Sequence, residues 1–255
     1  MDEYVQIGEV TTWYEQQGSG EPLVLLHGGM CTNEFSWAHQ MPEFAARFRV
    51  LAPERRGHGH TPDVPGPLSY DVMARDTVGF LETVVDGGAH LVGWSDGGIV
   101  GLVIAMTRPD LVHKLVAIGT NFHTTGLTPE ATDFFASVTA ESDDVAPLRI
   151  PYETVSPDGP EHWPVVFGKF SEMASAQPAL SVEQLGQISA PTLVLVGDHD
   201  MISLEHTAEL FRAIPNSQLG IVPGTTHDLA KQKAALVNRL ILDFLEQAPS
   251  PAGPN

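Results

Sequence analysis

Short apolar runs recur along the chain and predict the strands of a buried sheet. The run at residues 22–26 is apolar without interruption, which is typical of a strand covered on both faces. Other short runs of mostly apolar residues end at glycine or polar residues, as strands do. We therefore expect strands at residues 10–17, 22–26, 49–53, 90–92, 114–119, 191–196 and 218–222.

Segments with helical spacing of apolar residues lie between these runs. They predict helices at residues 36–48, 69–85, 96–107, 203–214 and 228–247. Ser69 is a suitable N-cap for the second of these, and the third is apolar on nearly all sides, as a buried helix would be. The alternation predicts a three-layer α/β/α domain with a mostly parallel sheet. A chain of 255 residues is long enough for one such domain.

The alternation stops between residues 121 and 190. Seven prolines interrupt this stretch, and only short helical pieces remain, at residues 132–140 and 165–175. About 70 residues without a strand are too many for a simple connection, so we expect a helical lid inserted between core segments 1–120 and 191–247. The Pro-rich stretch 248–255 is expected to be a disordered tail.

The first candidate for chemistry is Gly93-Trp94-Ser95-Asp96-Gly97, between an apolar run and the buried helix. A serine at the tip of a tight strand-to-helix turn needs neighbours without bulk two positions away on each side, and Gly93 and Gly97 meet that need. The turn would expose the Ser95 hydroxyl and direct the backbone N–H of Asp96 to the same space. The motif alone is weak evidence, because glycine and serine are common.

A serine nucleophile requires a base and an acid that orients the base. In open α/β sheets these groups come from loops at the carboxyl ends of later strands. Asp198 and Asp200 follow the run at 191–196, and His227 follows the run at 218–222. The order serine, aspartate, histidine is that of α/β-hydrolases. Spacing alone leaves both aspartates open; Asp198 is the better candidate for bracing the turn through its own backbone.

Backbone N–H groups that could hold an oxyanion are expected from Gly29, in His27-Gly28-Gly29-Met30 after a buried strand, and from Asp96. The Asp96 side chain has two interpretations. It could contact a substrate ammonium group, or it could cap the buried helix, and we favour the cap.

Apolar residues that could line a substrate pocket lie near the serine and in the lid. They are Met30, Trp94, Phe122, Phe134, Trp163 and Phe167. The lid aromatics could equally form the small core of the lid itself, which is the interpretation we favour. His58 and His60 resemble a metal-binding pair, but no set of carboxylate or cysteine partners lies near them in the sequence, so we predict no metal ligands.

The net charge is −19, from 13 basic and 32 acidic residues. Such a surface repels nucleic acid and anionic membranes, and neutral or cationic small molecules are the easier substrates. The charge also serves solubility, the explanation we favour. No apolar run is long enough to cross a membrane. The N-terminus lacks a signal-peptide pattern and Cys31 is the single cysteine, so we expect a cytoplasmic protein.

Several of these motifs together resemble the α/β-hydrolase superfamily, and within it the small lid-bearing serine esterases of the biphenyl-hydrolase-like, valacyclovir-hydrolase-like group. The resemblance spans roughly residues 12–247 and is weakest across the lid. It rests on Leu26-His27-Gly28-Gly29, Arg56-Gly57-His58-Gly59, Gly93-Trp94-Ser95-Asp96-Gly97-Gly98, Gly197-Asp198-His199-Asp200 and Gly224-Thr225-Thr226-His227.

The resemblance implies an α/β-hydrolase fold and a catalytic triad of Ser95, Asp200 and His227, with no metal or organic cofactor. It implies hydrolysis of a small carboxylic ester or related acyl compound through an acyl-enzyme. Carbon–carbon hydrolysis, lactone opening and perhydrolysis stay open, because one fold hosts many reactions. A slow-turnover ligand sensor or signalling protein with an intact triad is the alternative outside enzymes. The sequence gives no expectation for the oligomeric state.

Overall fold

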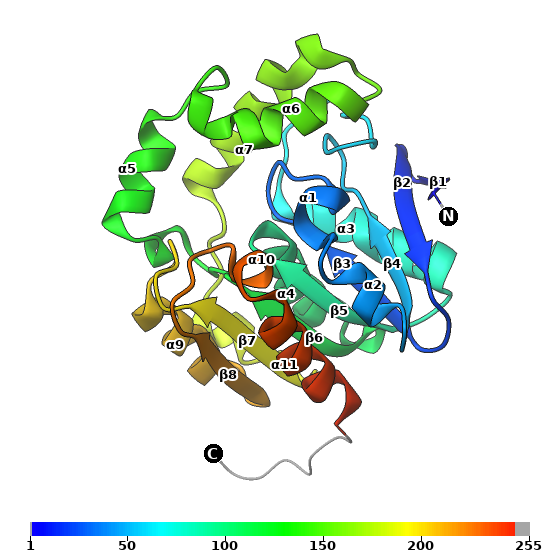
Figure 1. The fold of residues 1–255 in the computed structure, drawn as a ribbon, viewed down its shortest axis with the longest axis vertical. Coiled ribbons are helices and arrows are strands. Elements are labelled where there is room, and N and C mark those ends of the chain that lie inside the picture. Colours follow the sequence, from blue (N-terminus) through cyan, green and yellow to red (C-terminus); the bar gives the residue numbers. More distant parts are fainter. Residues whose placement is uncertain (1, 248–255) are drawn as a thin grey trace.

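An eight-stranded sheet forms the centre of the computed structural model, which describes residues 2–247 (Figure 1). Along the sheet the order is β1-β2-β4-β3-β5-β6-β7-β8. The pairs β1–β2 and β2–β4 are antiparallel, and all later neighbours are parallel. The strands are β1 (Asp2–Ile7), β2 (Val10–Gln17), β3 (Pro22–Leu26), β4 (Arg49–Pro53), β5 (Ala89–Trp94), β6 (Val112–Ile118), β7 (Thr192–Gly197) and β8 (Ser217–Val222).

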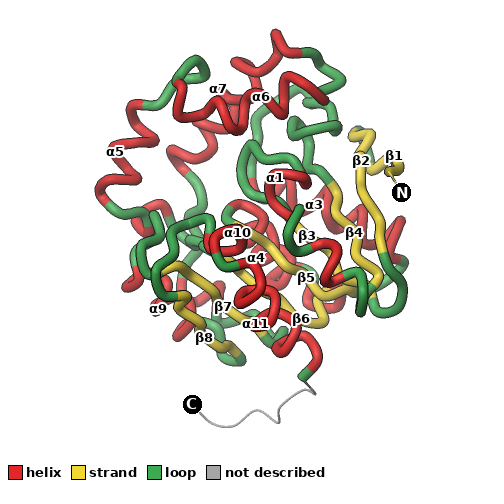
Figure 2. The backbone as a smooth tube through the Cα atoms, viewed as in Figure 1, coloured by secondary structure: helices red, strands yellow, loops and turns green. Residues whose placement is uncertain are grey.

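Helices cover both faces of this sheet, as the apolar runs predict (Figure 2). Leu23 and Leu25 of β3 pack in one apolar cluster, and Val24 and Leu26 pack in the other, because successive side chains of a strand point to opposite faces. The helices are α1 (Asn33–Trp37), α2 (Met41–Phe44), α3 (Tyr70–Phe80), α4 (Asp96–Thr107), α5 (Pro129–Ser137), α6 (Ala146–Val155), α7 (Trp163–Ala176), α8 (Val182–Leu185), α9 (Leu204–Ala213), α10 (Leu229–Gln232) and α11 (Ala234–Glu246).

The structure differs from the predicted elements at three places near the sheet. The strand β1 at the sheet edge was not predicted. The single helix expected at 36–48 is two short helices, since Pro42 in the first turn of α2 lacks an N–H and obstructs a continuous helix. The helix expected at 228–247 is broken at Lys233, whose φ of −133° and ψ of 50° are not helical. The short α10 that results holds the preceding loop, because the side chain of Gln232 bonds both the N–H and the hydroxyl of Thr226.

The stretch between β6 and β7 contains α5 to α8, of which α5, α6 and α7 gather at one end of the molecule, above the sheet in Figure 1. The helix α6 was missed because its prolines suggested a loop. Pro147 lies in the first turn, where no N–H is needed, and Pro151 lies inside the helix. The helix α7 is fastened to the loop before α3, since Lys169 Nζ lies 2.6 Å from Asp63 Oδ2 and His162 Nε2 lies 2.9 Å from it.

In the described part of the chain, the search for a helix long and apolar enough to span a membrane finds none. The tail expected at 248–255 lies outside the described residues.

Candidate active site

Ser95 occupies the turn between β5 and α4. Its backbone angles, φ 54° and ψ −120°, are ones that residues other than glycine rarely adopt. Its N–H donates to the carbonyl of Ile118 on the neighbouring strand at 2.8 Å. It is the one partly exposed residue in the otherwise buried stretch 91–100. The turn therefore presents the serine at the surface of a rigid core.

The two glycines of the motif are required by close backbone contacts. A Cβ at Gly93 would lie 2.3 Å from the carbonyl oxygen of Gly97, and a Cβ at Gly97 would lie 1.9 Å from the carbonyl oxygen of Leu26. Real Cβ atoms do not approach so closely. The G-x-S-x-G pattern thus has the steric cause inferred from the sequence.

Asp200 and His227 form a buried pair at the same edge of the sheet. His227 Nδ1 lies 2.8 Å from Asp200 Oδ1. The Asp200 side chain is 0% exposed and that of His227 is 16% exposed. A Cβ at Gly119, after β6, would lie 2.9 Å from His227 Nδ1. The pair therefore packs against the end of the strand next to β5.

His227 lies beside both neighbours of Ser95. Its carbonyl accepts a hydrogen bond from Trp94 Nε1 at 3.0 Å, and the two rings are 5.4 Å apart between centroids. Asp96, on the other side of Ser95, is close enough for the His227 charge to affect its carboxyl group. His227 therefore contacts the residue before Ser95 and acts on the carboxyl group of the residue after it.

Asp198 serves a different purpose from Asp200. Its Oδ1 accepts the N–H of Thr225 at 3.0 Å, in the loop that carries His227. Hydrogen bonds from the backbone of Gly224 and Thr225 lower the pKa of Asp198. Asp198 therefore braces the neighbouring loop, and a hydrogen bond from its own backbone also lowers its pKa, as the expected bracing of its own turn requires. His199 between the two aspartates is 75% exposed.

Gly29 and Asp96, the predicted oxyanion donors, are neighbours in space. A Cβ at Gly29 would lie 2.8 Å from Asp96 Oδ2 and 2.7 Å from the ring of Phe170. Asp96 begins α4, so its N–H has no acceptor within the helix. The helix also contributes a partial positive charge at this point.

The Asp96 side chain does not cap α4, which corrects the interpretation that the sequence favoured. Its Oδ1 accepts a hydrogen bond from the Tyr70 hydroxyl at 3.0 Å, whereas Oδ2 is buried without a hydrogen-bond partner among the described residues. Burial raises the pKa of Asp96, and the charge of Arg55 opposes this effect. A buried carboxylate oxygen without a partner is costly and is a suitable contact for a donor on a ligand.

Two residues of this environment, Arg55 and Tyr70, were missed by the sequence analysis. Arg55 is buried, and its Nη2 donates to the carbonyl of Gly28 at 3.1 Å. Burial lowers its pKa to about 10. Arg55 could have been found from the sequence, because it directly precedes the family motif Arg56-Gly57-His58-Gly59. Tyr70 could not, because nothing distinguishes it from the other residues of helix α3.

The predicted pocket residues divide into separate groups. Met30, Trp163 and Phe167 belong to one apolar cluster with lid residues, so the lid aromatics form a core that Met30 joins. Trp94 packs in a sheet cluster beside His227. Phe122 stacks on His206 with ring centroids 4.0 Å apart. Phe134 is 37% exposed on α5 and pairs with Phe135, and its place in a substrate pocket stays a prediction.

Phe170 is a better candidate for the pocket than Phe134. It is partly buried, packs against both the lid cluster and one sheet cluster, and reaches the Cα of Gly29. The sequence analysis did not select Phe170, because its contact with Gly29 joins two segments that are far apart in the chain.

His58 and His60 do not form a metal-binding pair. His58 Nδ1 contacts the carbonyl of Arg56 at 2.8 Å, and burial lowers the pKa of His58 to about 3. His60 Nδ1 lies 3.0 Å from Glu54 Oε2 and its ring stacks on Trp13 at 4.0 Å. Glu54, six residues before His60, is a carboxylate neighbour that the sequence analysis did not consider.

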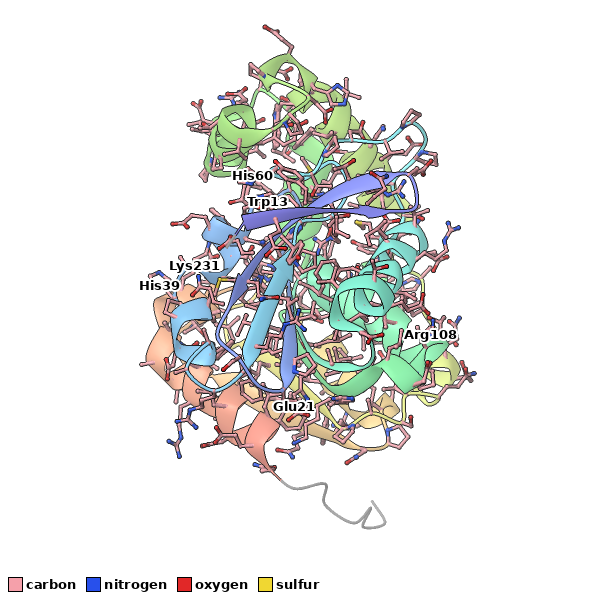
Figure 3. All side chains as sticks on the ribbon, turned by 90° about the vertical axis from the view of Figure 1, so that its right-hand side faces the viewer. Trp13, Glu21, His39, His60, Arg108 and Lys231 are labelled. Atoms are coloured by element: carbon pink, nitrogen blue, oxygen red, sulfur yellow. The ribbon has the colours of Figure 1, made fainter. Side chains whose placement is uncertain are left out.

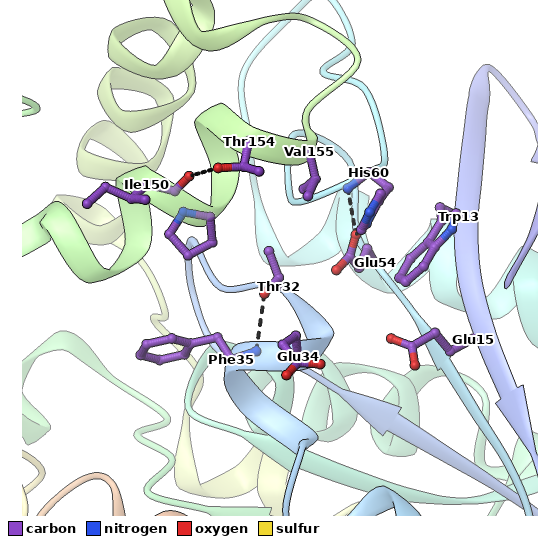
Figure 4. A pocket seen from close by; sticks show the side chains of 11 residues that line it. Trp13, Glu15, Thr32, Glu34, Phe35, Glu54, His60, Ile150, Thr154 and Val155 are labelled. Carbon is purple, nitrogen blue, oxygen red and sulfur yellow. Dashed lines mark hydrogen bonds and ion pairs between the residues drawn. The ribbon is translucent and has the colours of Figure 1, made fainter.

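A cleft of about 500 Å³ lies between β2, α1 and α6 (Figure 4). Trp13 and His60 form part of its wall, and both also appear in Figure 3. Its remaining lining residues are Glu15, Thr32, Glu34, Phe35, Glu54, Ile150, Pro151, Thr154 and Val155. Phe35 of this cleft stacks on Trp94, the residue before Ser95, with ring centroids 6.2 Å apart. Acidic and aromatic side chains make the cleft favourable to cations.

A strained serine turn, a buried Asp–His pair and an inserted helical segment on a parallel sheet define the class of α/β-hydrolases. Comparison with known proteins agrees: the profile of the alpha/beta hydrolase family matches residues 23–240, and the chain belongs to this family. The enzyme Serine hydrolase BPHL of Homo sapiens is 27% identical over 95% of this chain and 85% of its own. The 2-hydroxy-6-oxo-2,4-heptadienoate hydrolase of Pseudomonas putida is 30% identical over 94% of this chain and 95% of its own.

Solved structures show the same fold. A meta-cleavage product hydrolase from Pseudomonas fluorescens has a TM-score of 0.82 at 21% identity and covers 97% of this chain and 98% of its own. An enol-lactonase from Burkholderia xenovorans has a TM-score of 0.78 at 23% identity, with 96% and 100% covered. The protein is therefore an enzyme of the α/β-hydrolase family with BPHL-like relatives.

Proposed function

We propose that this enzyme is a serine hydrolase that cleaves a small carboxylic ester or related acyl compound through an acyl-enzyme on Ser95. The observation that carries the proposal is the position of Ser95 on a strained, partly exposed turn beside the buried Asp200–His227 pair. The human relative is itself named a serine hydrolase.

In the proposed reaction His227 removes the hydroxyl proton as Ser95 attacks the acyl carbon. The tetrahedral oxyanion is held by the N–H groups of Gly29 and Asp96, each of which can contribute ~3 kcal/mol to the transition state. His227 then returns the proton to the leaving alcohol. Water, activated by the same imidazole, releases the acid and restores Ser95. Asp200 orients the imidazole and stabilises its protonated form.

The first test is turnover of p-nitrophenyl esters of increasing acyl length by the wild type and by Ser95→Ala. We expect many turnovers by the wild type and a loss of at least 10³-fold in Ser95→Ala, because the nucleophile is absent. A single burst without turnover would favour the ligand-sensor alternative. Equal rates in the two proteins would refute the proposal.

Turnover of a vinylogous 1,5-diketone but of no ester would favour carbon–carbon hydrolysis, the reaction class that the name of the Pseudomonas putida relative suggests.

Within this function, we propose that the acyl group of the substrate carries an ammonium group that contacts Asp96. The support is Asp96 Oδ2, which is buried, has no hydrogen-bond partner in the described part of the chain and lies beside Gly29. The acidic residues of the cleft lined by Trp13 and His60 favour the same kind of molecule.

The test compares an α-amino ester with its des-amino analogue. We expect the wild type to prefer the amino ester at least 10-fold in kcat/KM, and Asp96→Asn to lose that preference while keeping the backbone N–H. Since burial raises the pKa of Asp96, the preference should decline as pH falls and the carboxylate takes up a proton. Equal kcat/KM for both esters in the wild type would refute the ammonium proposal and leave the serine hydrolase intact.

A further inference from the structure

A second cluster of chemically active side chains lies at the amino ends of the central strands. Glu21 directly precedes β3, His90 is the second residue of β5, and His113 is the second residue of β6. These three strands are neighbours in the order β3-β5-β6. Ser95 lies at their carboxyl ends. Figure 3 shows Glu21 at the end of the molecule opposite the lid helices. The cluster is therefore separate from the candidate active site.

An irregularity in the sheet brings the two histidines together. The register pairs Ala89 with Val112 but His90 with Lys114, so His113 is an extra residue in β6. A bulge of this kind redirects the side chain that it displaces. The ring centroids of His90 and His113 are consequently 5.6 Å apart. In a regular strand the neighbours His113 and Lys114 would point to opposite faces, and only Lys114 would share a face with its partner His90.

The ligand atoms are spaced for a small metal ion. Glu21 Oε1 lies 3.1 Å from His90 Nε2 and 3.4 Å from His113 Nδ1, and one ligand atom from each residue lies within 4.8 Å of the others. Zinc bonds of about 2.0–2.1 Å to nitrogen and oxygen give a tetrahedral ligand-to-ligand separation of about 3.3 Å. In the described residues this is the only group of three such side chains found.

His90 is a buried side chain, 4% exposed, whose Nε2 forms an ion pair with Glu21 Oε1 at 3.1 Å. Neither ring nitrogen makes a hydrogen bond of acceptable geometry to a described residue. Such atoms usually have a partner in a folded protein. Glu21 and His113 are 54% and 44% exposed, so an ion can reach the cluster from solvent.

The charges around the cluster permit a cation. Lys114 is the nearest lysine, but its ammonium donates to the carbonyls of Phe244, Leu245 and Gln247 at the end of α11. The net charge of the chain is −19. A dication therefore meets a carboxylate and an overall attractive field.

We propose that Glu21, His90 and His113 bind a first-row transition-metal dication of the Zn²⁺ type, with water as the fourth ligand. Two imidazoles and one carboxylate suit Zn²⁺ better than Ca²⁺ or Mg²⁺, which prefer all-oxygen sites. The ion joins the starts of three adjacent strands. Its role is structural, because the serine chemistry lies at the other end of these strands.

The test uses the full-length chain without a histidine tag, stripped of metal by a chelator and titrated with ZnCl₂ in a calorimeter. We expect one Zn²⁺ per chain and a rise in Tm of about 5–10 °C at a free concentration of 100 times Kd. Replacing Zn²⁺ with Co²⁺ should produce the visible absorption of a tetrahedral cobalt centre. Absence of stoichiometric binding would overturn the proposal.

Exposed ligands are the residues to change, because their variants should still fold. His113→Ala and Glu21→Gln should each weaken Zn²⁺ binding at least 10-fold and abolish the Co²⁺ absorption. The matched control is His199→Ala, which removes another exposed histidine and should bind like the wild type. If all three variants bind Zn²⁺ equally, or if only His199→Ala loses binding, the site is not the one proposed.

Discussion

At the scale of single residues, the site depends on which of two aspartates, Asp198 or Asp200, contacts His227. Asp198 and Asp200 are two positions apart in one turn, yet Asp200 contacts His227 and Asp198 contacts the N–H of Thr225. The Gly-Asp-x-Asp motif predicted that one of them would serve. The family resemblance favoured Asp200, and only the fold shows the contact that each makes.

This difference gives a paired prediction. Asp200→Asn should lower kcat roughly 10³–10⁴-fold, because an amide no longer favours the Nδ1-protonated form of His227 or stabilises its charge. Asp198→Asn should lower kcat by less than 10-fold, since its partner is a backbone N–H that an amide oxygen can also satisfy. Steady-state kinetics on a p-nitrophenyl ester measure both. Equal losses in the two variants would contradict the assignment of Asp200.

At the scale of elements, the position of α4 against the sheet fixes the serine turn. Gly97, the second residue of α4, lies directly on the backbone of Leu26 and His27 at the end of β3. That contact also brings the loop of Gly29 next to the start of the helix. A single close approach therefore positions both proposed oxyanion donors.

Gly97→Ala should lower the free energy of unfolding by at least ~2 kcal/mol, because its Cβ would lie 1.9 Å from the Leu26 oxygen and the backbone must shift. Ester hydrolysis should fall with it. The control is Gly168→Ala in α7, where no atom lies within 4 Å of the added Cβ. That change should raise the free energy by about 0.5–1 kcal/mol, as alanine favours a helix. Urea unfolding measures both, and a harmless Gly97→Ala would refute the close-packing account.

The elements also show where periodicity fails as a guide. Prolines were interpreted as interruptions of the lid, but Pro147 begins α6 and Pro151 lies within it. In the segment 36–48 a single proline had the opposite effect and divided the expected helix. Pro42 begins the second of two helices and Pro151 lies inside one, so the apolar pattern does not reveal whether a proline starts, interrupts or is tolerated within a helix.

At the scale of the whole molecule, several histidines are enclosed as neutral groups. Burial lowers the pKa of His58 to about 3 and that of His206 to about 4. The unfolded chain has histidine pKa values near ~6.5. Between these values the unfolded state binds more protons, so each histidine reduces stability as pH falls from about 6.5 toward its folded-state pKa.

We therefore expect the slope of unfolding free energy against pH to contain up to ~1.4 kcal/mol per unit from His206 between pH 6 and pH 4.5. His206→Gln should remove this part of the slope, although it costs stability at pH 7 by disturbing the Phe122 contact. The control is His199→Gln, whose exposed side chain changes its surroundings little on unfolding. Denaturant unfolding at pH 7.0, 6.0 and 5.0 measures the slopes. An unchanged slope in His206→Gln would contradict a buried neutral imidazole.

The sequence by itself determined the class of fold, seven of the eight strands, and Ser95 and His227 as candidates for a triad. It could do so because these features are local: a strand buried on both faces must be apolar, and a crowded turn must have glycines at fixed spacing. Ser95, His227 and the glycine pair were identified on that ground.

Only the tertiary structure decided how distant segments meet. It placed Tyr70 and Arg55 around the Asp96 carboxylate and put Phe170 against Gly29. It also gathered Glu21, His90 and His113 from three strands. Such contacts depend on strand order, register and a bulge, which are set by packing of the whole chain and leave no local periodicity in the sequence.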